Sequence, residues 1–252
     1  MDTIGCVTFV IVFLIYLYYM YLGGVCMLKN LKLRVISFFL IFLTLFTITF
    51  TSVGETQYPV WKIDDSCPFT AELQELYSRL PKELRDLYAK KRLKIIVYGY
   101  DKWSGYLAFY YYEEHTLRME AYVKDYISYF KRKGVPEEML EEYDNESLSL
   151  LVAFDSLLHE LGHAYDSFAG KKNSSSKAFR KAYQEEKKMF KESKFNHIPN
   201  GNVGANLKDS VEYFASTFSC YFLFPQDLKE HAPKTYEFFH EKFPDGLDGK
   251  IE

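Results

Sequence analysis

The sequence predicts an α+β domain with short helices and a small sheet, followed by a mostly helical C-terminal part whose first long helix carries an H-E-x-x-H motif. Two observations support this prediction. Aromatic and β-branched residues are concentrated in short runs between residues 93 and 123. Most later segments instead place apolar residues at helical spacing. The order of helix, sheet and then helices is typical of α+β folds.

The N-terminal segment has the pattern of a targeting sequence. A short basic stretch begins at Met27, an apolar run follows at Val35–Phe50, and small residues come next at Ser52–Gly54. This order of basic, apolar and small residues is typical of a secretory signal. We therefore expect residues 27–54 to be a signal peptide and residues 1–26 to be an extension ahead of the true start.

An alternative interpretation takes the chain as starting at Met1. The apolar run Cys6–Cys26 is then just long enough to span a bilayer, and Val35–Phe50 forms a short return helix. The basic residues between the two runs would occupy a cytoplasmic turn. Both interpretations place residues 55–252 outside the cytoplasm, secreted or membrane-anchored, and limit membrane contact to the N-terminal segment.

Residues 55–252 have the composition of one globular domain. They contain no block or stripe of Lys and Arg, so nucleic acid is not expected as a partner. Cys67 and Cys220 could form a disulfide in an oxidising compartment. Cys220 lies in an apolar helical segment that would bury a free thiol equally well, so two separate buried thiols are the favoured interpretation.

The first half of the domain is expected to contain short helices around a small sheet. Thr70–Arg92 predicts two helices, the second starting at Pro81. Two charged segments, Lys124–Lys133 and Glu137–Tyr143, are also helix-prone. The three strand-like runs are Leu93–Gly99, Tyr106–Tyr112 and Leu117–Val123.

The second half is predicted to be helical. A long apolar helix begins at a cap residue, Asn145 or Ser147, and ends near Gly170. Asn196–Asn206 contains glycines and a proline and is expected to be a loop. The later helices are expected at Ala178–Glu192, Val211–Phe224 and Pro233–Phe243.

The long helix carries the motif His159-Glu160-Leu161-Gly162-His163. Two histidines four residues apart lie on one face of a helix, so both imidazoles can bind one ion. Neutral imidazole is a good zinc ligand. Glu160 lies beside the pair and can act as a general base. The sequence therefore predicts a hydrolase that uses one zinc ion per chain to cleave peptide bonds.

A catalytic zinc site needs a third protein ligand. The position six residues after His163 is Ala169, which excludes the elongated metzincin pattern. Glu212 is the best candidate, because it lies at the head of an otherwise apolar helix and a buried carboxylate is unfavourable unless it is paired or binds a metal. It could also be an ordinary carboxylate on the exposed edge of that helix. The alternative ligands are Asp209, His197 and Glu185.

Three stretches carry a family resemblance through their order and spacing. They are HELGHAYDSFAG at His159–Gly170, EYFASTF at Glu212–Phe218 and APKTYEFF at Ala232–Phe239. Together they resemble the zinc peptidases of the anthrax-toxin lethal factor type, which include the Pro-Pro endopeptidases. The resemblance implies zinc on His159, His163 and Glu212, with Glu160 as the base. It also implies a gluzincin-like fold, in which a small mixed sheet lies beside the active-site helix and its edge strand pairs with an extended protein or peptide substrate.

The chain departs from this family at position 205. Its members usually have a tyrosine seven residues before the ligand glutamate, where it donates a hydrogen bond to the oxyanion; this chain has Ala205. Loss of such a donor typically reduces the rate by about a hundredfold or more. His197 and Asn202 in the same loop are candidate replacements. The departure also motivates a rival hypothesis, in which the chain is a catalytically impaired zinc-binding module with a binding or toxin-accessory role.

Two other residues are candidates for the site. Asp166 follows His163 by about one helical turn and could orient a ligand imidazole, unless it is an ordinary exposed aspartate. Trp103 follows the first predicted strand and could line the substrate groove, for example by stacking on a proline. The alternative for Trp103 is simple packing in a turn.

Overall fold

The computed structural model describes residues 58–99, 108–169, 173–198 and 207–248. Within this part of the chain, four strands form one sheet in the order β1-β2-β4-β3. β1, β2 and β4 are parallel, and β3 pairs antiparallel with β4 at one edge. The strands are β1 Val60–Ile63, β2 Lys94–Tyr98, β3 Ala108–Tyr111 and β4 Thr116–Glu120. The predicted α+β class with a small mixed sheet is therefore confirmed.

Helices make up most of the remaining structure in the described residues. The N-terminal ones are α3 Thr70–Ser78, α4 Lys82–Lys90 and α5 Tyr126–Arg132. The later ones are α6 Asn145–Phe168, α7 Lys177–Phe190, α8 Lys194–His197, α9 Ser210–Leu223, α10 Pro225–His231 and α11 Pro233–His240. In the residues that the structure describes, no helix is both long and apolar enough to cross a membrane.

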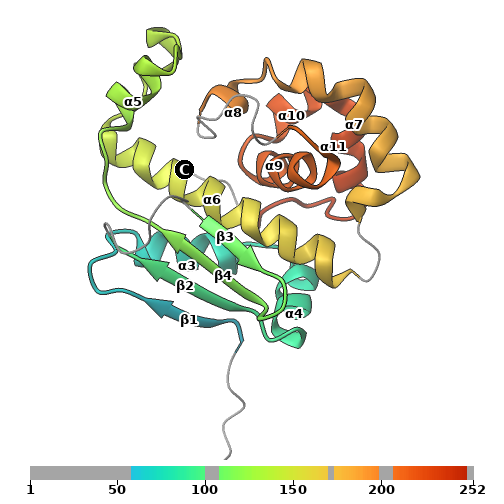
Figure 1. Cartoon of the computed structure of the whole chain (residues 1–252), viewed down its shortest axis with the longest axis horizontal. Coiled ribbons are helices and arrows are strands. Elements are labelled where there is room, and N and C mark those ends of the chain that lie inside the picture. The colour runs from blue at the N-terminus through green and yellow to red at the C-terminus, as the bar shows by residue number, and fades with distance from the viewer. Residues whose placement is uncertain (1–57, 100–107, 170–172, 199–206, 249–252) are drawn as a thin grey trace, which may run out of the picture. The chain divides into compact units, whose positions relative to one another are not determined.

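Helix α6 is the central element of the domain. It packs on β3 and β4 of the sheet and, elsewhere on its surface, against α9. Figure 1 shows α6 between the sheet and the group formed by α7, α9, α10 and α11. The helix is apolar along most of its length, which suits an element covered by a sheet and by other helices.

A capping box at Asp144 fixes the start of α6. The Asp144 carboxylate accepts a hydrogen bond from the Ser147 backbone N–H at 2.7 Å, and the Ser147 hydroxyl accepts one from the Asp144 N–H at 3.0 Å. The expectation that Asn145 or Ser147 is the cap was therefore wrong. Asn145 is the first helical residue, and its side chain instead accepts from the backbone N–H of Ile127 at 3.1 Å.

The structure differs from the sequence-based expectations in four other places. Strand β1 was not predicted, because its sequence VWKI does not alternate apolar and polar residues. The helix expected at Glu137–Tyr143 is only a 3₁₀ turn at Glu137–Met139. The expected loop at Asn196–Asn206 begins inside α8, which Ser193 caps. Helix α10 was not predicted as a separate element, although Pro225 starts it.

Cys67 and Cys220 are both buried and both free. The favoured interpretation of two separate thiols is confirmed. Cys220 lies within α9, where burial raises the pKa of its thiol well above the usual value. The thiol therefore stays protonated and behaves as a small apolar group.

The C-terminal helices are tied together by aromatic packing and by one buried carboxylate. Glu186 on α7 accepts hydrogen bonds from the backbone N–H groups of Lys234 and Thr235, at 2.7 and 3.0 Å, at the start of α11. The Thr235 hydroxyl also lies 3.0 Å from the Tyr213 hydroxyl of α9. These contacts satisfy polar groups that the start of a helix leaves unpaired. They fix α9 relative to α7 and α11.

Gly162 allows α6 and α9 to approach closely. A methyl group at this position would lie 3.1 Å from the Cα atom of Ala215 and 3.2 Å from the Cβ atom of Phe218. The nearest of these atoms is backbone and cannot rotate away. A larger residue would therefore have to push the two helices apart.

Substituting Gly162→Ala tests this close approach through the sign of the stability change. Glycine to alanine in a helix interior normally stabilises by about 1 kcal/mol. Here the clash with α9 should reverse the sign, and we expect a loss of about 1–3 kcal/mol in the free energy of unfolding, as is typical of overpacking. Denaturant titration measures the change. Unchanged or increased stability would show that the helices separate easily at this point.

Candidate metal centre

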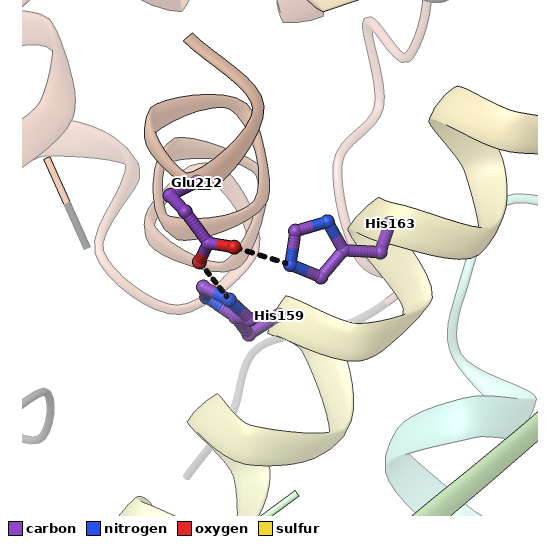
Figure 2. A group of neighbouring side chains, drawn as sticks. All are labelled: His159, His163 and Glu212. Atoms are coloured by element: carbon purple, nitrogen blue, oxygen red, sulfur yellow. Dashed lines mark ion pairs between the residues drawn. The ribbon is translucent and has the colours of Figure 1, made fainter. Parts of the chain in front are cut away.

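Three side chains from two helices converge on one point. His159 and His163 lie one turn apart on α6, and Glu212 reaches them from the first turn of α9. The Nε2 atom of His159 is 3.4 Å from one Glu212 carboxylate oxygen, and the Nε2 atom of His163 is 3.7 Å from the other. Figure 2 shows both imidazoles directed at this carboxylate. One potential ligand atom from each residue lies within 4.8 Å of the others.

Asp209 sets the position of Glu212 by capping α9. Its carboxylate accepts hydrogen bonds from the backbone N–H groups of Val211 and Glu212, at 2.9 and 3.0 Å. Asp209 is thus committed to the helix start and is not in the converging group. Glu212 lies one turn further on, where the helix dipole also favours a negative charge.

The carboxylate and the imidazoles perturb one another. Hydrogen bonds from His159 and His163 hold the pKa of Glu212 well below its usual range, against the effect of burial. Burial by itself would lower the pKa of His159, but the Glu212 hydrogen bond and the charges of Glu160 and Asp155 outweigh it and raise that pKa. The site therefore favours positive charge next to Glu212.

The geometry of this group fits a zinc ion. Ligand atoms about 2.0–2.1 Å from a tetrahedral zinc lie about 3.3–3.4 Å from one another. The distances of 3.4 and 3.7 Å between the imidazole nitrogens and the carboxylate oxygens are close to that spacing. Two imidazoles and one carboxylate are also a common donor set for a catalytic zinc, which keeps its fourth position open.

Glu160 follows His159 in the chain but is not one of the three converging residues. It is only 7% exposed, and burial raises the pKa of its carboxyl group, while the two histidines act in the opposite direction. Its carboxylate also interacts with the backbone N–H of Tyr110 on β3. Glu160 therefore occupies the space between α6 and the edge strand, and it is not part of the ligand group. A buried carboxyl with a raised pKa is suited to proton transfer near neutral pH.

A second polar contact between α6 and α9 lies next to His159. The Ser216 hydroxyl is 3.4 Å from the Nδ1 atom of His159, and the Ser219 hydroxyl donates to the Asp155 carboxylate at 2.7 Å. Burial raises the pKa of Asp155 to about 6, against the opposing effects of His159 and Ser219. The sequence analysis missed these residues. Asp155 lies four residues before His159, and Ser216 and Ser219 lie four and seven residues after Glu212. This spacing places each on the same helix face as a residue of the metal centre, so it could have indicated them from the sequence.

Comparison with known proteins bears on the C-terminal half of the chain. Residues 136–242 match the family model described as anthrax toxin lethal factor, N- and C-terminal domain. This segment contains the three stretches on which the resemblance was based. The resemblance to that family is confirmed. This similarity suggests the metallopeptidase class of enzyme.

One solved structure is also similar to the chain. It is the PRO-PRO endopeptidase (PPEP-2) from Paenibacillus alvei, with 21% identity and a TM-score of 0.40. The similarity covers 73% of this chain and 96% of that one. A TM-score this low does not establish a shared fold, and the fold described above stands on the chain's own sheet and helices. No match was found among curated proteins.

Asp166 is buried, which excludes the alternative of an ordinary exposed helix residue. Its carboxylate accepts hydrogen bonds from the Ser174 backbone N–H at 2.9 Å and from the Ser174 hydroxyl at 2.7 Å. These bonds tie the end of α6 to the 3₁₀ turn Asn173–Ser175. The Nδ1 atom of His163 is buried and has no hydrogen-bond partner among the residues that the structure describes. A role for Asp166 in orienting an imidazole stays a prediction.

Tyr112 is a further residue near the site that was not predicted from the sequence. Its ring centroid lies 4.9 Å from that of Tyr110, and its side chain is 46% exposed. Partial burial, together with the negative charges of Glu160 and Glu212, raises the pKa of its phenol to about 12. Tyr112 therefore presents a neutral hydroxyl near the site at physiological pH. Tyr112 lies two residues after Tyr110, and this spacing places both side chains on the same side of an extended segment, which could have indicated the pair from the sequence.

The remaining candidates are placed away from the ligand group or outside the described residues. His197 ends α8 and is partly buried, and it is not in the converging group. Its predicted role as an oxyanion donor stays a prediction. Trp103, Asn202 and Ala205 lie outside the described residues.

Proposed function

We propose that this chain is an extracytoplasmic zinc metalloendopeptidase that cleaves a peptide bond in an extended protein segment. The observation that supports this most strongly is the convergence of His159, His163 and Glu212, with Glu160 buried beside them. The match to the lethal factor family supports the same class of enzyme.

The residues around the metal centre have separate roles in this proposal. Zinc, when bound by the two histidines and Glu212, would polarise the substrate carbonyl and lower the pKa of a water molecule. Glu160 takes a proton from the attacking water while the water oxygen bonds to the carbonyl carbon. The same carboxyl then gives that proton to the leaving amine nitrogen as the C–N bond breaks. Burial of Glu160 raises the pKa of its carboxyl group, which makes the carboxylate a stronger base toward the attacking water.

The substrate is proposed to lie along β3. This strand forms one edge of the sheet and packs against α6, which carries the histidines. An extended peptide can add to a sheet edge through main-chain hydrogen bonds. Such a peptide would pass Glu160, whose carboxylate interacts with the Tyr110 N–H. The exposed side chains of Phe109 and Tyr112 on or next to β3 would border it.

Substituting Glu160→Gln separates catalysis from metal binding. We expect the variant to keep one zinc per chain, because Glu160 is not in the ligand group, and to lose hydrolysis by about 100-fold or more, because it cannot accept a proton. Metal analysis and turnover of a peptide library, with and without chelator, measure the two properties. A variant that cleaves as fast as the parent would refute the mechanism. Zinc-bearing parent protein that turns over no peptide would favour the catalytically impaired module.

Glu212→Ala tests the third ligand, with Asp209→Ala as the matched control three residues away. Removing Glu212 leaves two imidazoles, so zinc affinity should fall by orders of magnitude. Removing Asp209 takes away a helix cap, which costs about 1 kcal/mol of stability and should affect zinc only mildly. Metal content after dialysis against a weak chelator measures the difference. Full zinc occupancy in Glu212→Ala, with loss in Asp209→Ala, would contradict the assignment.

The extracytoplasmic location rests on the order of residues from Met27 onward. We expect secreted protein to begin close to Glu55, since the small residues that precede it suit a cleavage site. N-terminal sequencing of the secreted material measures this. Recovery of an intact chain from membranes, beginning at Met1, would instead support the membrane-anchored alternative.

A further inference from the structure

Three buried polar side chains form a hydrogen-bond chain that links α9 to α11 and α7, the helices grouped beside it in Figure 1. The Tyr213 hydroxyl of α9 lies 3.0 Å from the Thr235 hydroxyl of α11. The Thr235 hydroxyl in turn donates to a carboxylate oxygen of Glu186 on α7 at 2.8 Å. Tyr213 and Thr235 are 0% exposed and Glu186 is 4% exposed, so water does not compete for these bonds.

The hydrogen bonds of this chain run in one direction. Thr235 has a single hydroxyl hydrogen, which it gives to the carboxylate, because an ionised carboxylate can only accept. The Tyr213 hydroxyl is therefore the donor to Thr235. Each of the three groups has a partner, and a fully satisfied buried network favours one arrangement of the elements that carry it.

The Glu186 end of the chain is a fixed point between α7 and α11. Besides the Thr235 hydroxyl, Glu186 accepts the backbone N–H groups of Lys234 and Thr235, at 2.7 and 3.0 Å. Ala232, at the cap position of α11, makes no side-chain hydrogen bond, so Glu186 takes the place of a cap residue. In the described part of the chain no Lys or Arg forms an ion pair with Glu186.

The Tyr213 end of the chain lies next to the third candidate ligand. Tyr213 follows Glu212 in the first turn of α9, and neighbouring helix residues project about 100° apart. Glu212 reaches the histidines of α6, whereas the Tyr213 ring packs against α7. The α7 rings within 5.8 Å of its centroid are Phe179, Tyr183 and Phe190. Apolar contact depends little on direction, so the hydroxyl adds a directional contact that the rings do not supply.

The rotation of α9 about its axis determines where Glu212 points. Side-chain atoms lie about 5–6 Å from the axis of a helix, so a rotation of about 20° moves them by about 2 Å. A metal site tolerates deviations of only about 0.2 Å in its ligand distances. The Glu212 oxygens now lie 3.4 and 3.7 Å from the two imidazole nitrogens. A contact that fixes this rotation therefore acts on the metal centre, although Tyr213 is not in the ligand group.

We propose that the hydrogen-bond chain from Tyr213 through Thr235 to Glu186 holds the first turn of α9 in the rotation that directs Glu212 at the two histidines. Tyr213 is in this sense a positioning residue for the ligand beside it. The inference rests on the proposed zinc site. It accounts for a hydroxyl in an aromatic pocket that a phenylalanine ring would fill equally well.

The test compares Tyr213→Phe with Tyr221→Phe in the full chain, purified in mild detergent. Tyr221 is a matched control because it lies on the same helix, is also buried, and donates its hydroxyl to the Phe243 carbonyl. It lies eight residues, about 12 Å, further along α9. Zinc affinity is measured by competition with a chromophoric chelator, and the thermal midpoint is measured on the metal-free protein. The visible absorption of the cobalt(II)-loaded protein reports the coordination geometry.

We expect both variants to lower the metal-free midpoint, because each loses one buried hydrogen bond. Only Tyr213→Phe should weaken zinc binding, by about 10-fold, and change the cobalt(II) spectrum. Tyr221→Phe should keep the zinc affinity and the spectrum of the parent. A purely structural role for Tyr213 predicts instead that both variants bind metal as the parent does, whatever their midpoints.

Variants of Thr235 test whether the effect passes along the chain. Thr235→Val removes the hydroxyl but keeps the backbone N–H groups that Glu186 accepts, and it should weaken zinc binding as much as Tyr213→Phe does. Thr235→Ser retains the hydroxyl and should restore the affinity of the parent. The double variant Tyr213→Phe/Thr235→Val should bind zinc no more weakly than either single variant, because both break the same chain.

Three results would overturn the inference while leaving the zinc site intact. The first is a zinc affinity of Tyr213→Phe equal to that of the parent, and the second is an equal loss of affinity in Tyr221→Phe. The third is a double variant about 100-fold weaker than the parent, which would mean independent effects. A parent that binds no zinc would instead refute the proposed function. Should Tyr213→Phe fail to fold, the comparison of Thr235→Val with Thr235→Ser decides, and equal affinities of these two would overturn the inference.

Discussion

The close approach of α6 and α9 at Gly162 is the constraint on which the rest of the structure depends. The glycine lies between the two motif histidines, and its missing side chain leaves room for the backbone of Ala215. Each helix alone presents an incomplete site, with two imidazoles on one and a carboxylate on the other. Only when the backbones are nearly in contact can Glu212 reach both rings. The packing of the two helices therefore determines the geometry of the centre.

The surroundings of α9 supply the rigidity that this arrangement needs. Aromatic rings of α7 and α11 pack against Tyr213 and Phe214 of α9. Glu186 accepts hydrogen bonds from Thr235 at the start of α11, and the Thr235 hydroxyl contacts the Tyr213 hydroxyl. On the other side of α6, β3 places the Tyr110 N–H against Glu160. Glu160 and Glu212 are thus held by contacts with different layers of the fold. Small displacements of either layer would change their separation, because close-packed interiors transmit strain.

Sequence reasoning predicted the parts of this structure that local patterns determine. The helical spacing of His159 and His163, the apolar helix that carries Glu212 and the strands β2, β3 and β4 were all identifiable from residue order. Strand β1 was missed because its pairing with β2 comes from tertiary contacts. The cap at Asp144 was missed because Asn145 has an equally suitable side chain, which α5 engages instead. Asp155 and Ser216 were missed because their contacts depend on the register between two helices.

The division of the centre between two helices has a consequence for the folding of the chain. A metal ion held by both would close a long loop that contains α7 and α8. Such a cross-link reduces the freedom of the unfolded chain, and metal binding adds directly to the free energy of folding. The segment between the helices would then exchange its amide hydrogens more slowly when metal is present. The protein would then resist proteolysis in its metal-loaded form and become vulnerable when chelators remove the ion.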